Sequence, residues 1–161
     1  MFDHILVVCT GNICRSPVAA ALLQRALPEK QVDSAGTHVE AANLTGRDMD
    51  NTAREVAYIE GLACPPHAAK QASRSLVNQS DLILVMEQQH KEWLSNRYPD
   101  SRGKTMLLGE WLNSDNEQNL RLGLGKGKDI ADPYQKSIEC HEQVYRDLAR
   151  AVSHWQSKLA E

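Results

Sequence analysis

The positions of apolar residues near the N-terminus predict a strand, a helix and a second strand. The run Ile5–Val8 is apolar at every position, which is typical of a strand buried on both faces. Helical spacing follows between Ser16 and Pro28, and the residues that carry it are Ala19, Leu22, Leu23, Ala26 and Leu27. Proline suits the first turn of a helix, as at Pro17, and Pro28 ends the pattern. Residues Val32–Ala35 predict a second, short strand.

The rest of the chain continues this alternation. An amphipathic helix is predicted from the spacing of Met49, Ala53, Val56 and Ala57, and it closes near Gly61. Further elements are expected as a strand over Leu82–Met86, a helix over Gln88–Arg97, a strand over Thr105–Leu108 and a long helix from about Gln135 to Leu159. The apolar seam of that last helix consists of Ile138, Tyr145, Leu148, Val152, Trp155 and Leu159.

Strands that alternate with helices predict an α/β fold. Right-handed crossovers place the helices on the faces of a parallel sheet, so we expect four parallel strands with helices on both faces. The length of 161 residues fits a single domain, residues 1–161. Residues 37–45 lack periodicity and predict an ordered loop, whereas residues 113–128 are rich in Asn, Gly and Lys and predict a mobile surface loop.

Candidate chemistry follows the first strand directly, in the segment Cys9-Thr10-Gly11-Asn12-Ile13-Cys14-Arg15-Ser16. Ligand crevices of parallel sheets form at the carboxyl ends of strands. Five residues between Cys9 and Arg15 allow the loop to curl with its backbone N–H groups facing one centre, and we expect Gly11 to supply an unusual φ angle. The N-terminus of the next helix adds positive potential. The segment therefore predicts a phosphate-binding loop.

A cysteine at the base of such a loop is a candidate nucleophile. Positive potential lowers the pKa of a thiol, so we expect Cys9 to be a thiolate that attacks phosphorus, with Ser16 donating a hydrogen bond to the sulfur. Arg15 can bind a phosphoryl group through two donors. A lone cysteine is more often a packing residue, but here spacing, glycine and the start of a helix coincide.

Cleavage of a phosphate ester also needs an acid for the departing oxygen. Asp132 precedes Pro133 just before the last predicted helix, and proline restricts its backbone. Asp132 is therefore the candidate general acid and, in a second step, the base. An Asp-Pro turn that only caps the helix is an equal alternative, and Asp129 is a weaker candidate for the acid.

Composition narrows the function classes. The net charge of −3 without a long basic run argues against a nucleic-acid surface, and no apolar run is long enough to span a bilayer. Four scattered cysteines and the lack of an export signal at the N-terminus favour the cytoplasm. The expected chemistry uses no cofactor and no metal.

The segment from Cys9 to Pro17, together with Asp132-Pro133-Tyr134, resembles the low-molecular-weight protein-tyrosine phosphatases. The resemblance extends over nearly the whole chain, including residues 32–36, 67–71 and 81–87, and looks closest to the bacterial branch found with capsule and exopolysaccharide tyrosine kinases. It implies a phosphotyrosine protein as substrate, specifically an autophosphorylated tyrosine kinase. We expect the chain to act as a monomer.

The resemblance also implies roles for individual residues. Cys9 would be the nucleophile, Arg15 the phosphate binder and Asp132 the acid and base. The residues implied at the substrate are Thr10, Gly11, Asn12, Ile13, Cys14, Ser16 and Tyr134. Asn12 and Ser16, with Ser34 and His67, also match positions that brace the phosphate loop. Cys14 matches a cysteine that can trap an oxidised nucleophile as a disulfide, and Tyr134 matches an aromatic residue beside the substrate ring.

Two segments depart from the family pattern. Residues 34–46 look longer than usual at the position of a specificity loop, and no aromatic residue lies between Thr37 and Thr45. Residues 113–128 look like an insertion before the acid loop. Both departures concern the choice of substrate and leave the candidate catalytic residues in place.

Three alternatives compete with a phosphatase. An arsenate reductase on the same fold relays a disulfide through two nearby cysteines, but Cys64 and Cys140 are far apart in sequence. A module that only binds phosphotyrosine would need neither a nucleophile nor an acid. A dinucleotide-binding domain would carry a Gly-x-Gly-x-x-Gly motif after the first strand, which this chain lacks.

Overall fold

Four parallel strands form one sheet at the centre of the computed structural model, which describes residues 1–112, 121–122 and 128–160. The strands are β1 (His4–Cys9), β2 (Gln31–Gly36), β3 (Leu82–Val85) and β4 (Thr105–Leu107), in the spatial order β2-β1-β3-β4. All three neighbouring pairs are parallel. The predicted four-stranded parallel sheet is confirmed.

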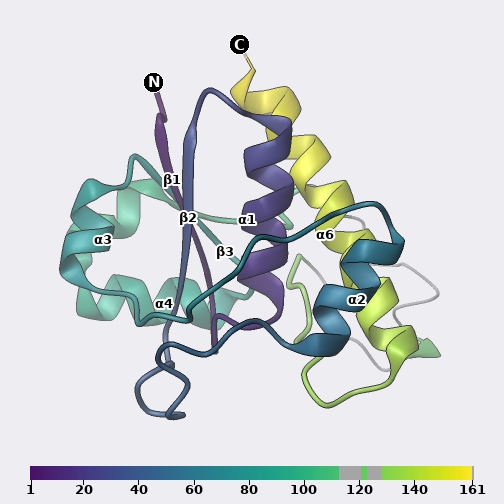
Figure 1. Cartoon of the computed structure of the whole chain (residues 1–161). Helices are drawn as coiled ribbons and strands as arrows, with labels where there is room; N and C mark the ends of the chain where they lie inside the picture. Colours follow the sequence, from purple (N-terminus) through teal and green to yellow (C-terminus); the bar gives the residue numbers. More distant parts are fainter. Residues whose placement is uncertain (113–120, 123–127, 161) are drawn as a thin grey trace.

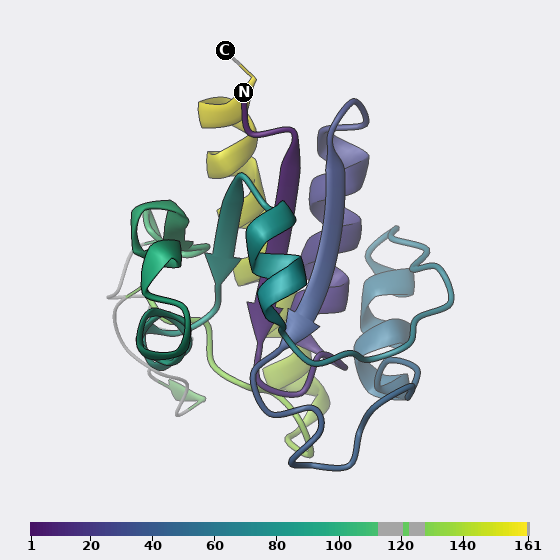
Figure 2. The same cartoon turned by 90° about the vertical axis from the view of Figure 1, so that its left-hand side faces the viewer.

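Helices cover both faces of this sheet (Figure 1). One face carries α1 (Arg15–Ala26), α2 (Asn51–Ile59) and α6 (Ile138–Leu159), and the other carries α3 (Arg74–Gln79) and α4 (Gln88–Arg97). A 3-10 helix, η1 (Pro99–Lys104), connects α4 to β4. Figure 2, turned by 90°, shows α3 in front of the strands and α1 behind them.

The helices on both faces of the sheet explain why β1 is apolar at every position from Ile5 to Cys9. Ile5, Val7 and Cys9 pack toward α1 and α6, whereas Leu6 and Val8 pack toward α3 and α4. None of these five side chains is more than 2% exposed. The prediction of a strand buried on both faces is therefore confirmed.

The start of the last helix was predicted too early. It begins at Ile138, because Gln135 has a left-handed backbone (φ 61°) that an α-helix cannot contain. Ser137 caps the helix by accepting a hydrogen bond from the Cys140 backbone N–H at 3.2 Å. Ile138 is consequently 64% exposed and does not belong to the buried seam.

The pattern of apolar residues does not predict α3. Only Val77 of this six-residue helix is buried, so a repeating apolar stripe is missing. The signal that was present is Ser73, whose side chain caps the helix. Of the two predicted loops, residues 37–45 lie beside the carboxyl end of β2, and residues 113–128 fall largely outside the described residues.

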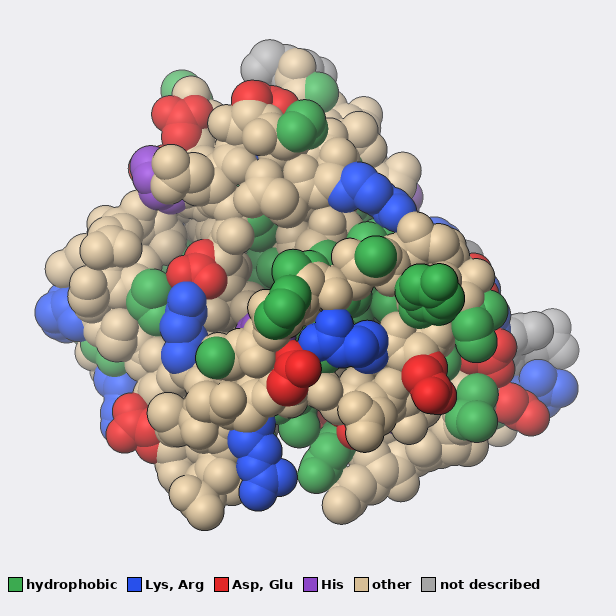
Figure 3. Space-filling model, in the orientation of Figure 1, with side chains coloured by type: hydrophobic (Ala, Val, Ile, Leu, Met, Phe, Trp, Pro, Cys, Tyr) green, Lys and Arg blue, Asp and Glu red, His purple; other side chains and the backbone are tan. Residues whose placement is uncertain are grey.

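Charged side chains of both signs are interspersed over the face shown in Figure 3. This distribution agrees with the small net charge of −3. Within the part of the chain that the structure describes, none of the helices has the length and apolar character that crossing a membrane requires.

Candidate active site

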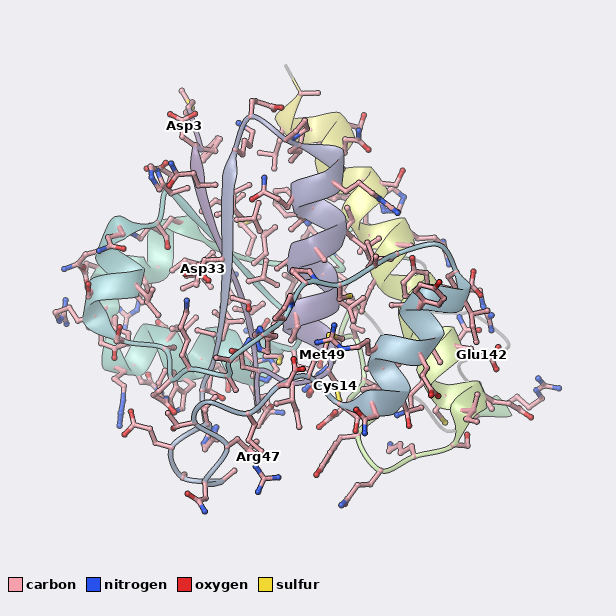
Figure 4. All side chains as sticks on the ribbon, in the orientation of Figure 1. Asp3, Cys14, Asp33, Arg47, Met49 and Glu142 are labelled. Carbon is pink, nitrogen blue, oxygen red and sulfur yellow. The ribbon has the colours of Figure 1, made fainter. Side chains whose placement is uncertain are left out.

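The segment from Cys9 to Arg15 lies at the carboxyl edge of the sheet, after its central strand β1. Cys9 is the last residue of β1, and Arg15 is the first residue of α1. Figure 4 shows Cys14 at the N-terminal end of α1, below the strands. This position is where ligand sites of parallel sheets form, as the sequence predicts.

The N-terminus of α1 has no side-chain cap, unlike those of three other helices. Asp50, Ser73 and Ser137 accept hydrogen bonds from the first turns of α2, α3 and α6. At α1 the N-cap residue is Cys14, which makes no such bond, and the first turn contains no acidic residue. The first N–H groups of α1 are therefore available to an anion.

The sulfur of Cys9 lies among hydrogen-bond donors. The backbone N–H of Asn12 donates to Sγ at 3.3 Å, and the Ser16 hydroxyl lies 2.9 Å from it. Ser16 Oγ accepts from the Asn12 side-chain amide at 2.8 Å, and of the two acceptors within reach of its own proton the sulfur is nearer than the Ala35 carbonyl oxygen, which lies at 3.5 Å. Both donors stabilise negative charge on Cys9, the arrangement expected for a nucleophile.

Asn12, and not Gly11, adopts the left-handed backbone conformation in the loop. Asn12 has φ 57°, whereas Gly11 has no positive φ, so the role expected for Gly11 is wrong. Asn12 tolerates this conformation because its side chain is fully bonded: Nδ2 also donates to Ser34 Oγ at 3.0 Å, and Oδ1 accepts from the Lys70 backbone N–H at 3.0 Å.

His67 reaches the same loop from the segment between α2 and α3. Its Nε2 lies 2.6 Å from the Asn12 carbonyl oxygen, which can only accept, so Nε2 is the donor. Ser34 and His67 thus both contact Asn12, 22 and 55 residues away in sequence. The structure therefore brings both side chains into contact with the loop that we expect them to support.

Hydrogen bonds on the side away from the pocket hold Arg15 in one orientation. Its Nη1 donates to Glu87 Oε1 at 2.5 Å and to the Ile130 carbonyl oxygen at 2.7 Å, and its side chain is only 2% exposed. Burial disfavours the charge, but Cys9, Asp132 and Glu87 together raise the pKa of Arg15 above its ordinary value. The guanidinium is therefore fixed and charged, with Nη2 left on the pocket side.

His90, on the first turns of α4, supports Thr10. Its Nδ1 accepts a hydrogen bond from the Glu87 backbone N–H at 3.0 Å, so the ring proton lies on Nε2 and is donated to Thr10 Oγ1 at 2.8 Å. Burial, and then the positive charge of Arg15, lowers the pKa of His90 to about 4. The neutral ring with its proton on Nε2 is the form present at pH 7.

Asp132 faces Arg15 across the pocket. Its Oδ2 lies 3.8 Å from Nη2 of Arg15, and its Oδ1 accepts from the Tyr134 backbone N–H at 3.1 Å. The alternative of a simple helix cap does not apply, because Ser137 caps α6. Asp129 instead accepts from the Gln88 backbone N–H at 3.0 Å, at the start of α4. Of these two aspartates, Asp132 is the one that lines the pocket.

These residues surround one pocket of about 170 Å³. Its base and rim contain Cys9, Thr10, Gly11, Ile13, Cys14, Arg15 and Asp132, and its outer wall contains His38, Ala42, Leu44 and Tyr134. Asn12 and Ser16 are fully buried and do not line the pocket, and their side chains contact each other, Cys9 and Ser34.

Comparison with known proteins decides the family. Residues 4–161 match the family described as low molecular weight phosphotyrosine protein phosphatase. The low molecular weight protein-tyrosine-phosphatase Wzb of Escherichia coli (strain K12) is 45% identical over 159 residues, which cover 99% of this chain and 97% of that one. The chain belongs to the low molecular weight phosphotyrosine protein phosphatase family.

Solved structures of low molecular weight phosphatases share the fold. Vibrio vulnificus Wzb in complex with benzylphosphonate is 41% identical and has a TM-score of 0.87, with coverage of 99% of this chain and 100% of that chain. The YwlE arginine phosphatase from Geobacillus stearothermophilus is 29% identical, with a TM-score of 0.78 and coverage of 99% and 94%. Structures that share this fold therefore include one named as an arginine phosphatase.

The remaining cysteines of this low molecular weight phosphatase differ in environment. Burial and the charges of Asp50 and Asp132 raise the pKa of Cys14, so its thiol is protonated at neutral pH. Cys64 and Cys140 lie before α3 and on α6, and neither lines the catalytic pocket. The relay of cysteines that an arsenate reductase needs is therefore not assembled around Cys9.

Sequence reasoning missed Glu87 and His90 as site residues. Both follow β3 at the same carboxyl edge as Cys9, and the rule that ligand sites form there was applied only to β1. The available signal was a carboxylate directly after a buried strand, followed three residues later by a histidine at the start of a helix.

Proposed function

We propose that Cys9, Arg15 and Asp132 hydrolyse phosphotyrosine in proteins through a cysteinyl-phosphate intermediate, the activity of the family to which the chain belongs. The observation that supports this most directly is their convergence on one pocket at the uncapped N-terminus of α1. A nucleophile, a fixed cation and a carboxylate are the groups that the two-step transfer of a phosphoryl group requires.

In the first step, Cys9 Sγ attacks phosphorus while the bond from phosphorus to the tyrosine oxygen breaks. Asp132 gives its proton to that oxygen, so tyrosine leaves as a neutral phenol. The N–H groups of the loop and Arg15 Nη2 stabilise the oxygens of the transferring group. Because Glu87 and Ile130 already hold Nη1, Arg15 need not reorganise during the reaction.

In the second step, water attacks the phosphoryl group on Cys9. Asp132 accepts a proton from this water, the sulfur–phosphorus bond breaks, and inorganic phosphate leaves. The electron pair of that bond returns to Sγ, where the Ser16 hydroxyl and the Asn12 N–H stabilise it. The cycle restores Cys9 and leaves Asp132 protonated for the next substrate.

The shape of the pocket supports an aryl phosphate as substrate. Ile13, Ala42, Leu44 and Tyr134 supply apolar surface to the pocket. Apolar walls suit the ring of tyrosine. Tyr134 is 40% exposed, so its ring is accessible at the mouth of the pocket.

We also propose a partner and a location for this activity. The resemblance of the sequence implies an autophosphorylated bacterial tyrosine kinase as the partner, and we expect the phosphatase to act as a monomer formed by residues 1–161. A cytoplasmic location is consistent with four free cysteines, since thiols persist in reducing compartments.

Four assays test this proposal together. Three measure hydrolysis of p-nitrophenyl phosphate, of a phosphotyrosine peptide and of a phosphoarginine peptide, and the fourth measures thiol oxidation that depends on arsenate. We expect activity on the first two substrates and its loss in Cys9→Ser, with Cys140→Ser as a control at a cysteine outside the pocket. Activity that survives in Cys9→Ser would exclude the cysteinyl-phosphate route. A preference for phosphoarginine or for arsenate would replace phosphotyrosine as the substrate.

A further inference from the structure

A second groove, of about 450 Å³, lies directly beside the catalytic pocket. It runs between the loop that follows β2 and helix α4, both at the carboxyl edge of the sheet (Figure 1). We call it the α4 groove, and define it by His38, Gln71, Arg74, Trp93, Arg97 and Tyr98. His38 also lines the catalytic pocket, so a peptide can pass from one to the other.

One face of α4 connects the two sites. His90, Trp93 and Arg97 follow each other at steps of three and four residues and therefore lie on the same side of the helix. His90 contacts Thr10 at the phosphate loop, and Trp93 contacts His38 one turn later, with ring centroids 6.0 Å apart. At about 1.5 Å per residue, Arg97 lies roughly 10 Å from His90 along the helix axis.

Aromatic rings hold two guanidinium groups in the groove. The guanidinium carbon of Arg97 lies 4.8 Å from the centre of the Trp93 ring, and that of Arg74 lies 5.0 Å from the centre of the Tyr98 ring. The two rings contact each other edge to face at 6.3 Å. A guanidinium stacked on a ring keeps its N–H groups free at its edge, where they can bind a carboxylate.

The two arginines differ in their own partners. Arg74 pairs with Asp100 at 3.5 Å. For Arg97, no carboxylate of the described residues lies within ion-pair distance. Glu40 also lines the groove, on the side of the β2 loop. Of the two arginines that line the groove, Arg97 is therefore the one whose charge is open to a ligand.

The opposite wall of the groove is held in place by Gln71. Its Oε1 accepts from the backbone N–H groups of Val39 and Glu40 at 2.9 and 3.0 Å, and its Nε2 donates to the Thr37 carbonyl at 2.6 Å. These three bonds fix the loop on which His38 stands. The groove is thus formed before any peptide binds, which lowers the entropic cost of binding.

We propose that the α4 groove binds an acidic side chain of the phosphotyrosine substrate, with Arg97 as the residue that recognises its carboxylate. An extended peptide advances about 3.3 Å per residue, so a span of roughly 10 Å places the acidic residue about two to four positions from the phosphotyrosine. This inference rests on the proposed phosphotyrosine hydrolysis and adds a preference among its substrates.

Three phosphotyrosine peptides of equal length test the proposal. One carries Glu at positions two to four before the phosphotyrosine, one carries Glu at the same distances after it, and one carries Gln at all of these positions. The value of kcat/KM is measured for the wild type and for Arg97→Gln, with Arg150→Gln as a matched control at an exposed position of α6 outside the groove. Hydrolysis of p-nitrophenyl phosphate reports on the catalytic pocket alone.

We expect the wild type to favour one of the Glu peptides over the Gln peptide by about three- to fivefold, mainly through KM, the size expected for an exposed ion pair. The preference should vanish in Arg97→Gln, persist in Arg150→Gln and weaken as salt is added. Activity on p-nitrophenyl phosphate should be the same in all three proteins. In Arg97→Glu, a peptide with Lys at these positions should become the better substrate.

Equal kcat/KM for the three peptides in the wild type would overturn the proposal. A preference that Arg97→Gln retains in full would overturn it as well, because recognition would then lie elsewhere. A wild type that hydrolyses neither p-nitrophenyl phosphate nor any peptide would remove the proposed function itself, which is a separate and recognisable outcome.

Discussion

His90 donates a hydrogen bond from Nε2 to the hydroxyl of Thr10, a residue 80 positions earlier in the chain. The bond links the start of α4 to the phosphate loop. Arg15 Nη2 lies 3.4 Å from the same hydroxyl oxygen, so Thr10 stands between His90 and the phosphate-binding guanidinium. We therefore regard His90 as a positioning residue for the loop.

Removal of this bond should slow catalysis. For His90→Ala we expect kcat on p-nitrophenyl phosphate to fall about tenfold with a smaller change in KM, since small displacements of catalytic groups are costly. In His90→Gln the side-chain amide can still donate to Thr10 and should restore part of kcat. Steady-state kinetics of both variants measure this effect. An unchanged kcat in His90→Ala would exclude the positioning role.

Glu87→Gln should destabilise the fold and make it more dependent on phosphate. The variant removes the carboxylate bonded to Nη1 of the buried Arg15, and the remaining ion pair with Asp132 is longer, at 3.8 Å. We expect a loss of about 1–3 kcal/mol in the free energy of unfolding. Inorganic phosphate in the pocket compensates that charge, so it should stabilise Glu87→Gln more than the wild type. Urea unfolding with and without phosphate measures both effects.

An exposed carboxylate provides the control for Glu87→Gln. Asp33 pairs with Lys70 at 2.7 Å, but both side chains are about half exposed. Asp33→Asn should therefore cost less than about 1 kcal/mol, with no added response to phosphate. Equal losses of unfolding free energy in Glu87→Gln and Asp33→Asn would mean that burial of the Arg15–Glu87 pair adds nothing to its contribution to stability.

Asp132→Asn should impair poor leaving groups most. A phenolate with a high pKa needs a proton as it departs, whereas p-nitrophenolate needs little help, so we expect a loss in kcat of about 100-fold for phenyl phosphate and a smaller one for p-nitrophenyl phosphate. Asp129→Asn is the matched control, because Asp129 contacts Gln88 and does not line the pocket. Equal losses on both substrates would argue against Asp132 as the acid.

His90 should also make the stability of the fold depend on pH. Its pKa is lowered from an ordinary value near 6.5 to about 4 in the folded protein, by burial and by the charge of Arg15, with Glu87 acting in the opposite direction and His38 in the same one. Between about pH 4 and pH 6.5, His90 therefore binds a proton in the unfolded chain but not in the folded chain. The contribution is fully present above pH 6.5 and is lost as the pH falls toward 4.

By pH 5 this loss amounts to about 2 kcal/mol for His90. Urea unfolding at pH 7.5 and pH 5 should therefore show a larger difference in the wild type than in His90→Gln, where the titrating ring is gone. Other groups titrate in both proteins and cancel in the comparison. The same pH dependence in the two proteins would contradict the lowered pKa of His90.

Gly36→Ala should disturb the phosphate loop from the side of β2. A Cβ atom at Gly36 would lie 2.5 Å from the Thr10 carbonyl oxygen and 2.5 Å from Val39 Cγ2. We expect a loss of about 1–3 kcal/mol in unfolding free energy, as for other overpacked sites, together with lower kcat. Gly103→Ala is the control, because no atom lies within 4 Å of its added Cβ. Similar behaviour of the two variants would exclude a steric link to the loop.

Local patterns in the sequence predict the sheet and the reactive loop well. The apolar runs of β1 and β3 and the spacing of Cys9 and Arg15 are each contained within a few residues, so they can be read directly. Asp132 is also identifiable, through the proline that follows it. What remained ambiguous was its role, because an Asp-Pro turn before a helix has the same sequence as a helix cap, and only the position of Ser137 separates the two.

Contacts between distant segments explain what the sequence does not reveal. Glu87 and His90 act on Arg15 and Thr10 across neighbouring strands, and no local periodicity records such pairs. The left-handed residue was expected at Gly11 because glycine favours that conformation. The structure places it at Asn12, where side-chain bonds to Ser16, Ser34 and Lys70 compensate for the strain.

Because the N-terminus of α1 is uncapped, inorganic phosphate, the product of the reaction, can bind to the free enzyme. Released phosphate meets the same unsatisfied N–H groups that held it as a substrate group, so it should compete with new substrate and inhibit turnover as it accumulates. It should also raise the melting temperature, since a ligand that binds only the folded state stabilises it. An aspartate or serine cap at the N-terminus of α1, like those of α2, α3 and α6, would relieve this inhibition. The same cap would occupy the N–H groups on which catalysis depends.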